Sequence, residues 1–152
     1  MKTCTIEARP VAGRAFLDSN IVVYAFDTAD PVRHAAAQRM LRDYIRTGNA
    51  CVSTQVLGEV FVVLTRKVSP PLDPAEAAQV VHALGGFEVV EIGVTTVNLA
   101  LHYVLGAGIS YWDALIVAAA RLSECDHLLS EDLNAGQVFD TVTVVNPFVE
   151  PG

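Results

Sequence analysis

The sequence predicts an α/β sandwich built around a mostly parallel sheet. Short runs rich in Val, Ile and Leu alternate with longer amphipathic segments, and strands that alternate with helices are typical of this class. The chain has 152 residues, a length that suits one domain. Because 52% of the residues are hydrophobic and 18% are charged, the chain can form a core and is not a disordered protein.

The first half of the chain begins with residues 1–13, which we expect to be an extension that precedes the domain. A long amphipathic helix follows Asp30 and Pro31, which place an N-cap residue before a proline at the first helical position. Ser53 or Thr54 can cap the next helix. The expected elements are a strand over 14–17, a short apolar segment over 21–26, a helix over 31–46, a strand over 50–52 and a helix to about 67.

The second half repeats the cap-plus-proline start. Asp73 precedes Pro74 and begins a helix that Gly85 and Gly86 end. The run over 87–92 is rich in Val and predicts a buried strand. The other expected elements are a helix from 95 or 96 to 105, a helix over 112–124, and strands over 127–129 and 142–145. The expected single domain extends over residues 14–148.

The charge is unevenly distributed and argues against a protein that coats nucleic acid with basic side chains. The net charge is −7, from 10 Lys and Arg and 17 Asp and Glu, whereas such coating depends on the neutralisation of phosphates. Residues 101–152 contain seven acidic side chains and one basic side chain, Arg121. Most of the excess acidity therefore belongs to the last third of the chain.

Cysteine usage and hydropathy together predict a cytoplasmic protein. Cys4, Cys51 and Cys125 form no CxxC pair, so we expect reduced thiols rather than a disulfide framework or a zinc ribbon. The N-terminal residues lack the apolar run of a signal peptide. No apolar run approaches the roughly 20 residues of a membrane span, so we expect no membrane association.

Four acidic residues are candidates for a functional site. Asp18 and Asp132 each follow a predicted strand, and ligands of parallel sheets bind beyond the carboxyl ends of the strands. Glu59 lies in the helix after the second strand, and Asp113 lies in the first turn of a later helix. Both helical residues could reach the same edge of the sheet.

Three of these acids have simple structural alternatives. Asp18 can cap the turn that follows it. Asp113 fits a capping box with Ser110, and the helix dipole would favour its charge. Asp132 can be one of several solvated acids after a strand. Taken one at a time, these residues do not establish a functional site.

Glu59 is harder to explain as a surface residue. Its helix is apolar on nearly all sides, and the positions one turn away are Gln55, Val56, Val62 and Val63. A carboxylate in such surroundings needs a hydrogen bond, a metal ion or an ion pair, for example with Arg66.

Together the four acids predict a metal site. Carboxylates that converge repel one another unless a cation lies among them. Oxygen ligands without His or Cys favour Mg²⁺ or Mn²⁺ over zinc. The corresponding chemistry is phosphodiester hydrolysis, in which a metal ion activates water and shields the charge on the phosphate oxygens.

Four segments, in order and in spacing, resemble the motifs of PIN-domain ribonucleases. They are residues 15–20, Ser53 with Glu59 six residues later, residues 111–120, and residues 128–133 with Gly136-Gln137 after them. Within that family the chain is most similar to the small VapC-type toxins of bacterial toxin–antitoxin pairs. The resemblance implies a three-layer α/β/α sandwich and a Mg²⁺- or Mn²⁺-dependent endoribonuclease. It also implies a homodimer and neutralisation by a cognate antitoxin protein.

The resemblance also assigns roles by position. Asp18 and Asp113 would be the principal metal ligands, and Glu59 and Asp132 would complete the acidic cluster. The pattern selects Asp132 rather than the adjacent Glu131.

Two polar residues would assist the acidic cluster. Asn20 and Ser130 would orient ligands or water around the metal.

An acidic protein that cleaves RNA still needs cations for the phosphates. We expect these contacts from Arg33, Arg39, Arg42, Arg46, Arg66 and Lys67. The alternatives are a solvated helix face and a surface for the antitoxin.

Two other functions stay open at this stage. One is a catalytically inactive PIN-like protein that binds RNA or a protein partner. The other is a receiver-like or phosphatase domain with Asp18 as nucleophile. Receiver domains need a late lysine, and this chain has none after Lys67; dehalogenase-type phosphatases need a second Asp where Asn20 stands.

Overall fold

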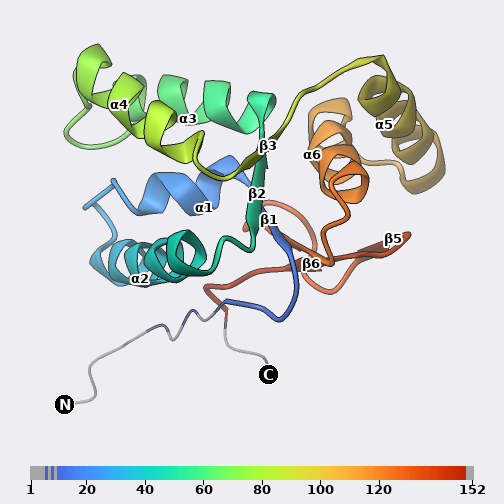
Figure 1. The fold of residues 1–152 in the computed structure, drawn as a ribbon, viewed down its shortest axis with the longest axis horizontal. Helices are drawn as coiled ribbons and strands as arrows, with labels where there is room; N and C mark the ends of the chain where they lie inside the picture. The colour runs from blue at the N-terminus through green and yellow to red at the C-terminus, as the bar shows by residue number, and fades with distance from the viewer. Residues whose placement is uncertain (1–5, 7, 9, 150–152) are drawn as a thin grey trace.

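The structure is a computed structural model that describes Ile6, Ala8 and residues 10–149. Its sheet has six strands: β1 (Ala15–Leu17), β2 (Ala50–Ser53), β3 (Glu88–Val90), β4 (His127–Leu129), β5 (Val138–Phe139) and β6 (Val142–Val145). The helices are α1 (Ser19–Tyr24), α2 (Pro31–Thr47), α3 (Thr54–Arg66), α4 (Pro74–Leu84), α5 (Val94–Ala107) and α6 (Tyr111–Leu122). Helices α1 to α4 lie on one side of β1–β3, and α5 and α6 lie on the other side (Figure 1).

The sheet is mostly parallel, as the sequence predicts. The strand order is β3-β2-β1-β4-β6-β5, and only the β5–β6 pair is antiparallel. Strand β1 lies between β2 and β4, with Phe16 opposite both Cys51 and Leu128. All three residues of β1 are buried. The α/β/α sandwich is therefore confirmed.

Local capping signals explain where several helices begin. The Asp30 side chain accepts a hydrogen bond from the Arg33 N–H, and Pro31 is the first residue of α2. The C-cap of α2 is Gly48, whose φ of 72° is in the left-handed region that glycine adopts at low cost. Ser53 caps α3 by accepting from the Val56 N–H. These starts agree with the sequence prediction.

The structure corrects three expectations about the elements. Residues 19–24 form a helix of six residues, which the apolar pattern of residues 21–26 did not identify as helical. Strand β5 was not expected. The strand expected to be buried over 87–92 is the shorter β3, with Glu88 exposed and Val89 and Val90 half-buried. It is less buried because β3 lies at one edge of the sheet.

The described part of the expected extension packs along α2. Ala8 is 7% exposed, and the Val11 N–H donates to the Tyr44 hydroxyl at 3.1 Å. The Arg39 guanidinium donates to the Ile6 carbonyl oxygen at 2.8 Å. Residues 1–5, 7 and 9 of the extension, which include Cys4, lie outside the described residues.

Helix α6 forms the centre of the second helical layer. Its residues 114–120 are all buried, and the helix contacts β2, β4 and α5. Within the described residues no single helix is long and apolar enough to cross a membrane. The pair α5 and α6 reaches the required length and composition only together and is bent by 119°.

Candidate functional site

Asp18 is the centre of the candidate site. It directly follows β1, and its backbone N–H donates to the Leu129 carbonyl oxygen at the end of β4. Its carboxylate caps α1 by accepting from the Ser19 N–H at 2.7 Å. The predicted capping role is therefore real, but it uses only Oδ1. The side chain is 6% exposed, so the second oxygen, Oδ2, also needs partners inside the protein.

Ser130 provides one partner for the second oxygen of Asp18. Its buried hydroxyl donates to Asp18 Oδ2 at 2.8 Å and accepts from the Asp132 N–H at 3.2 Å. Ser130 follows β4, and its own N–H donates to the Val145 carbonyl oxygen of β6. The ends of β1, β4 and β6 therefore meet at Ser130.

Asn20 lies between the carboxylates of Asp18 and Asp132. Its Nδ2 donates to Asp132 Oδ2 at 2.9 Å and lies 3.5 Å from Asp18 Oδ2. Its Oδ1 accepts from the Glu131 N–H at 3.2 Å. The amide thus fixes the loop after β4 as well as the Asp132 side chain.

The adjacent Glu131 faces away from this network. Its carboxylate accepts from the Tyr24 hydroxyl and forms an ion pair of 2.8 Å with Arg33 Nε. Asp132, rather than Glu131, is therefore the acid of this loop that shares the Asn20 amide with Asp18.

Glu59 joins the network through Ser19. The Ser19 hydroxyl donates to Glu59 Oε2 at 2.7 Å and lies 3.5 Å from Asp18 Oδ1. Gln55 Nε2 donates to the other Glu59 oxygen at 2.8 Å. No ion pair in the described part of the chain joins Glu59 to Arg66.

The surroundings of Glu59 differ from the sequence expectation. Helix α3 is not buried on all sides, because Phe61 is 36% exposed and Val62 is 43% exposed. Glu59 itself is half-buried. The carboxylate accepts hydrogen bonds from Ser19 and Gln55.

Asp113 is connected to the site only through the backbone. Its N–H donates to the Ser110 hydroxyl at 3.2 Å, which is the predicted cap of α6. Gln55 Nε2, which also contacts Glu59, lies 3.3 Å from the carbonyl oxygen of the preceding residue, Trp112. Within residues 10–149 the Asp113 carboxylate itself makes no hydrogen bond.

The predicted cluster of four carboxylates is therefore only partly assembled. Asp18, Glu59 and Asp132 share one hydrogen-bond network, with Ser19 and Asn20 inserted between the carboxylates. Among the described residues, no three His, Cys, Asp or Glu side chains lie close enough to hold a metal ion together.

The donors nevertheless fit a hard cation. They are carboxylate and hydroxyl oxygens, and Mg²⁺ commonly uses only one or two protein carboxylates together with water. Asp18, Glu59, Asp113 and Asp132 take part in none of the ion pairs found among the described residues.

Burial raises the pKa of Asp18 from 3.8 to about 6. The hydrogen bonds from Ser130 and from the Ser19 N–H oppose this rise, whereas the charges of Glu59 and Asp132 add to it. The site therefore holds a desolvated carboxylate beside two further acids, and a bound cation would lower the cost of its charge.

Two contributors were missed at the level of sequence. Ser19 bridges Asp18 and Glu59, and Gln55 bridges Glu59 and Trp112. Gln55 could have been identified in part, since it lies four residues before Glu59 on one helix and such positions face each other. Its contact with Trp112 has no local signal.

The predicted basic residues do not form one surface. Arg33 is half-buried and pairs with Asp30 and Glu131, and its guanidinium lies 5.8 Å from the Tyr24 ring centre and 5.7 Å from that of Phe148. Its charge is therefore already paired within the protein.

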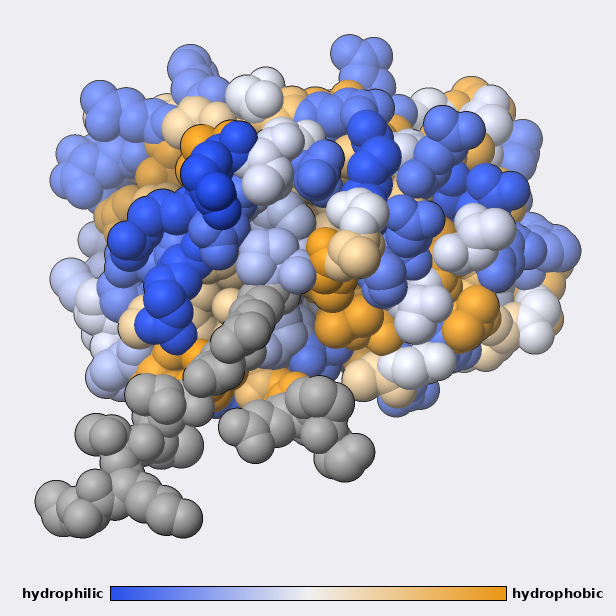
Figure 2. All heavy atoms as spheres, turned by 60° about the horizontal axis from the view of Figure 1, so that its bottom comes forward, coloured by the Kyte–Doolittle hydropathy of each residue, from blue (hydrophilic) through white to orange (hydrophobic). Residues whose placement is uncertain are grey.

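The other basic residues are exposed in two separate places. Arg39, Arg42 and Arg46 lie on α2, and hydrophilic side chains gather on that side of the molecule in Figure 2. Arg66 and Lys67 lie at the end of α3. Lys67 lines a shallow hollow of about 600 Å³ that also includes Glu59.

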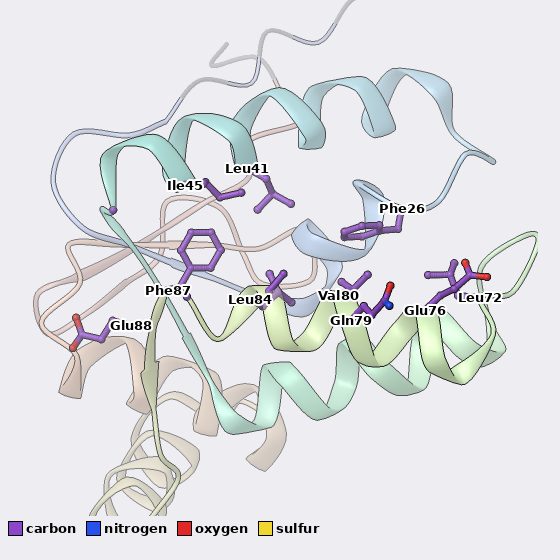
Figure 3. Close-up of a pocket in the computed structure, with 13 residues that line it drawn as sticks. Phe26, Leu41, Ile45, Leu72, Glu76, Gln79, Val80, Leu84, Phe87 and Glu88 are labelled. Atoms are coloured by element: carbon purple, nitrogen blue, oxygen red, sulfur yellow. The ribbon is translucent and has the colours of Figure 1, made fainter.

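A larger apolar groove lies away from the acidic residues. It has a volume of about 740 Å³ and lies between α2 and α4 (Figure 3). Phe26, Leu41, Ile45, Leu84 and Phe87 line it together with other residues, and none of the four candidate acids does. The groove is therefore a separate feature from the acidic site.

The fold and the site together define an α/β protein with acidic residues at the carboxyl edge of a parallel sheet. A family model described as the PIN domain matches residues 15–139, so the chain belongs to the PIN-domain family. The resemblance noted in the sequence is confirmed at this level. A comparison with curated proteins gives no match.

Several solved structures have a similar fold. A toxin–antitoxin complex from Klebsiella pneumoniae has a chain that is 18% identical with a TM-score of 0.64, over 88% of this chain and 98% of that chain. VapC20 of Mycobacterium tuberculosis, a sarcin–ricin loop cleaving toxin, is 19% identical with a TM-score of 0.62, over 78% and 89%. VapBC2 of Rickettsia felis, bound to a DNA fragment from its promoter, is 15% identical with a TM-score of 0.59, over 86% and 96%. At these identities the likeness shows a shared fold.

Proposed function

We propose that the chain is a Mg²⁺- or Mn²⁺-dependent endoribonuclease that acts as the toxin of a toxin–antitoxin pair. The observation that carries the proposal is the network of Asp18, Asp132 and Glu59 at the carboxyl edge of the sheet. No basic side chain of the described residues pairs with any of these acids. Acids gathered without a protein cation suit a site that binds a metal ion from solution.

The residues of the chain have distinct tasks in this proposal. Asp18 and Asp113 hold the metal, and Glu59 and Asp132 complete the acidic set. Ser130 and the Ser19 N–H fix the Asp18 carboxylate, and the Asn20 amide fixes that of Asp132.

The metal, when bound, supplies an activated water and shields the negative charge on the phosphate. Ser19 turns Glu59 toward the same edge of the sheet. The chain itself thus orients the acids before substrate arrives.

The toxin role rests on the relatives. The similar folds include chains from toxin–antitoxin complexes of Klebsiella pneumoniae and Rickettsia felis. We propose RNA as substrate, a cognate antitoxin as partner and the cytoplasm as location. A homodimer is also proposed, supported by exposed apolar side chains on α5, where Leu101 is 46% and Leu105 is 88% exposed.

Cleavage of RNA with controlled metal content tests the proposed activity. We expect cleavage by the wild type in Mg²⁺ or Mn²⁺, no cleavage in EDTA, and a loss of at least about 100-fold for Asp113→Asn and Asp132→Asn. Asp43→Asn is the matched control, because Asp43 is an acid on α2 whose partner is Arg46. Full activity of Asp113→Asn in Mg²⁺ would contradict the proposed mechanism.

The toxin role has its own test. Induced expression of the chain is expected to stop bacterial growth, and co-expression of a small neighbouring open reading frame is expected to restore it. Restored growth without a complex between the two purified proteins would argue against a protein antitoxin.

The remaining alternative is a PIN-like protein that binds RNA or a partner without cleaving it. The intact set of four acids favours the enzyme. RNA binding by the wild type with no cleavage in either metal would favour the alternative.

A further inference from the structure

Gln55 connects two elements of the acidic site. Its Nε2 donates to Glu59 Oε1 at 2.8 Å and to the Trp112 carbonyl oxygen at 3.3 Å. Glu59 lies one turn further along α3, whereas Trp112 belongs to the first turn of α6 and directly precedes Asp113. One amide group therefore joins an acid of α3 to the helix that carries another acid.

The two partners also fix the orientation of the amide. A carboxylate oxygen and a carbonyl oxygen can only accept hydrogen bonds, so the NH₂ group of Gln55 must face them. The carboxamide oxygen is consequently turned away. It is buried and has no hydrogen-bond partner among the described residues.

An unsatisfied buried oxygen carries a cost. In general a buried acceptor without a donor costs about 1–3 kcal/mol, and such groups call for a specific explanation. Here the explanation is that the amide cannot satisfy its oxygen without losing the contacts with Glu59 and Trp112.

We infer that Gln55 is a positioning residue of the acidic site, which holds the Glu59 carboxylate in place and fixes the first turn of α6 beside it. The inference rests on the proposed nuclease function and adds a residue that is outside the acidic set. Ser19 holds only the other oxygen of Glu59. Without Gln55, Glu59 can rotate about that single contact and Asp113 loses its hydrogen-bonded link to α3.

The variant Gln55→Met tests this inference because it keeps the length of the side chain and removes its hydrogen bonds. We expect kcat for RNA cleavage to fall about 10- to 100-fold with KM changed less than about twofold. We also expect the affinity for Mn²⁺, measured by calorimetry without RNA, to fall by a similar factor. Gln55→Leu, which also removes the donor and adds no charge beside Glu59, is a second variant with the same expected direction.

Gln38→Met is the matched control. Gln38 on α2 also joins two elements, since its Nε2 donates to the Ala25 carbonyl oxygen at 3.2 Å. It contacts none of the acidic residues. We therefore expect Gln38→Met to keep wild-type kcat and Mn²⁺ affinity even if its melting temperature falls.

A spectroscopic signal gives a readout that does not depend on activity. Trp112 is the only tryptophan of the chain, and its side chain is 66% exposed. We expect its fluorescence anisotropy to fall in Gln55→Met, because its carbonyl loses the bond to α3, and to stay unchanged in Gln38→Met.

The outcomes separate the two proposals. Wild-type kcat, Mn²⁺ affinity and Trp112 anisotropy in a folded Gln55→Met would overturn the role of Gln55, even if Asp113→Asn is inactive. If the wild type does not cleave RNA, the nuclease proposal fails, and the Mn²⁺ affinity and anisotropy of the Gln55 variants still decide whether Gln55 positions the site.

Discussion

Charged side chains have different partners at the two ends of the parallel sheet. At the amino end, Arg14 precedes β1, and its guanidinium forms an ion pair with Glu88 and donates to Cys51 Sγ. The Arg14 N–H donates to Asp126 Oδ2 at 3.1 Å.

At the carboxyl end, the side-chain hydrogen bonds of Asp18, Asp132 and Glu59 within the described part of the chain come from neutral donors. These donors belong to Ser19, Asn20, Gln55 and Ser130. The amino end is thus internally neutralised and structural. The three acids at the carboxyl end form no ion pair with a basic side chain of the described residues.

The same difference is visible in the pKa values. Glu88, through a side-chain hydrogen bond, raises the pKa of Arg14, so that charge is stabilised. Burial raises the pKa of Asp18 to about 6, so that charge is destabilised. A carboxylate whose charge is destabilised in the folded state is consistent with the proposed metal site, where a bound cation would offset that cost.

The largest expected effect contrasts activity at the two ends. Asp18→Asn is expected to lower RNA cleavage by at least about 100-fold, because Asn cannot supply the charge a metal needs. Arg14→Met is expected to stay within about threefold of the wild type, because Arg14 is remote from the acids. Equal losses in both variants, measured at saturating Mn²⁺, would remove the functional distinction between the ends.

Stability is expected to change in the opposite sense at Asp18. The rise in its pKa from 3.8 to about 6 corresponds to about 3 kcal/mol. At Asp18 the metal-free folded state therefore binds a proton more tightly than the unfolded state. The stabilisation that this proton gives the folded state is fully present below pH 3.8 and is lost as the pH rises through 6. Asp18→Asn avoids the loss, since Asn has no charge to bury.

Urea titrations in EDTA measure this effect. We expect Asp18→Asn to be more stable than the wild type by about 2–3 kcal/mol at pH 8, with the difference shrinking toward pH 4. A difference that does not depend on pH would show that the carboxyl group is not the cause.

Arg14→Met is expected to give a smaller change of the other sign. Loss of the contacts with Glu88 and Cys51 should lower the free energy of unfolding by about 1–2 kcal/mol. The change is small because the Arg14–Glu88 ion pair is partly exposed, so water screens its attraction. Arg46→Met is the control, since Arg46 is 76% exposed and pairs only with Asp43. A larger loss for Arg46→Met, measured by urea unfolding, would contradict the structural role of the amino end.

The smallest expected effect concerns RNA binding beside the acids. Lys67 lines the hollow that includes Glu59, so Lys67→Met should raise KM for RNA a few-fold and lower the salt dependence of binding by about one phosphate contact. Arg33→Met should leave that salt dependence unchanged, because Arg33 already pairs with Asp30 and Glu131. If Arg33→Met changed the salt dependence of binding more than Lys67→Met, the RNA would lie beside Arg33 rather than beside Lys67.

Features with a local cause could be predicted from the sequence. Asp30 and Pro31 predict the start of α2, because helix capping depends on residues that are neighbours in the sequence. The exposed position of β3 could not be predicted, because it depends on the order of strands in the sheet. Asp18 and Asp132 are 114 residues apart in the sequence, and only the rule about strand ends brought them together.

Side-chain pairing was the least predictable part of the site. Arg33 resembled a free cation on a helix, yet its partner Glu131 is 98 residues away in the sequence. Gln55 lies one helical turn before Glu59, yet it also contacts Trp112, which is 57 residues away. Such contacts follow from tertiary packing and leave no periodic pattern.

The double use of Asp18, as helix cap and as acid, has a consequence for inheritance. Asn is as good an N-cap as Asp, so a single base change that exchanges them would silence the proposed enzyme and spare its fold. An allele of that kind would still make a protein able to occupy the proposed antitoxin. By binding the antitoxin, the inactive protein would leave fewer antitoxin molecules for active copies of the toxin. A cell that carries both alleles would then be exposed to more uninhibited toxin.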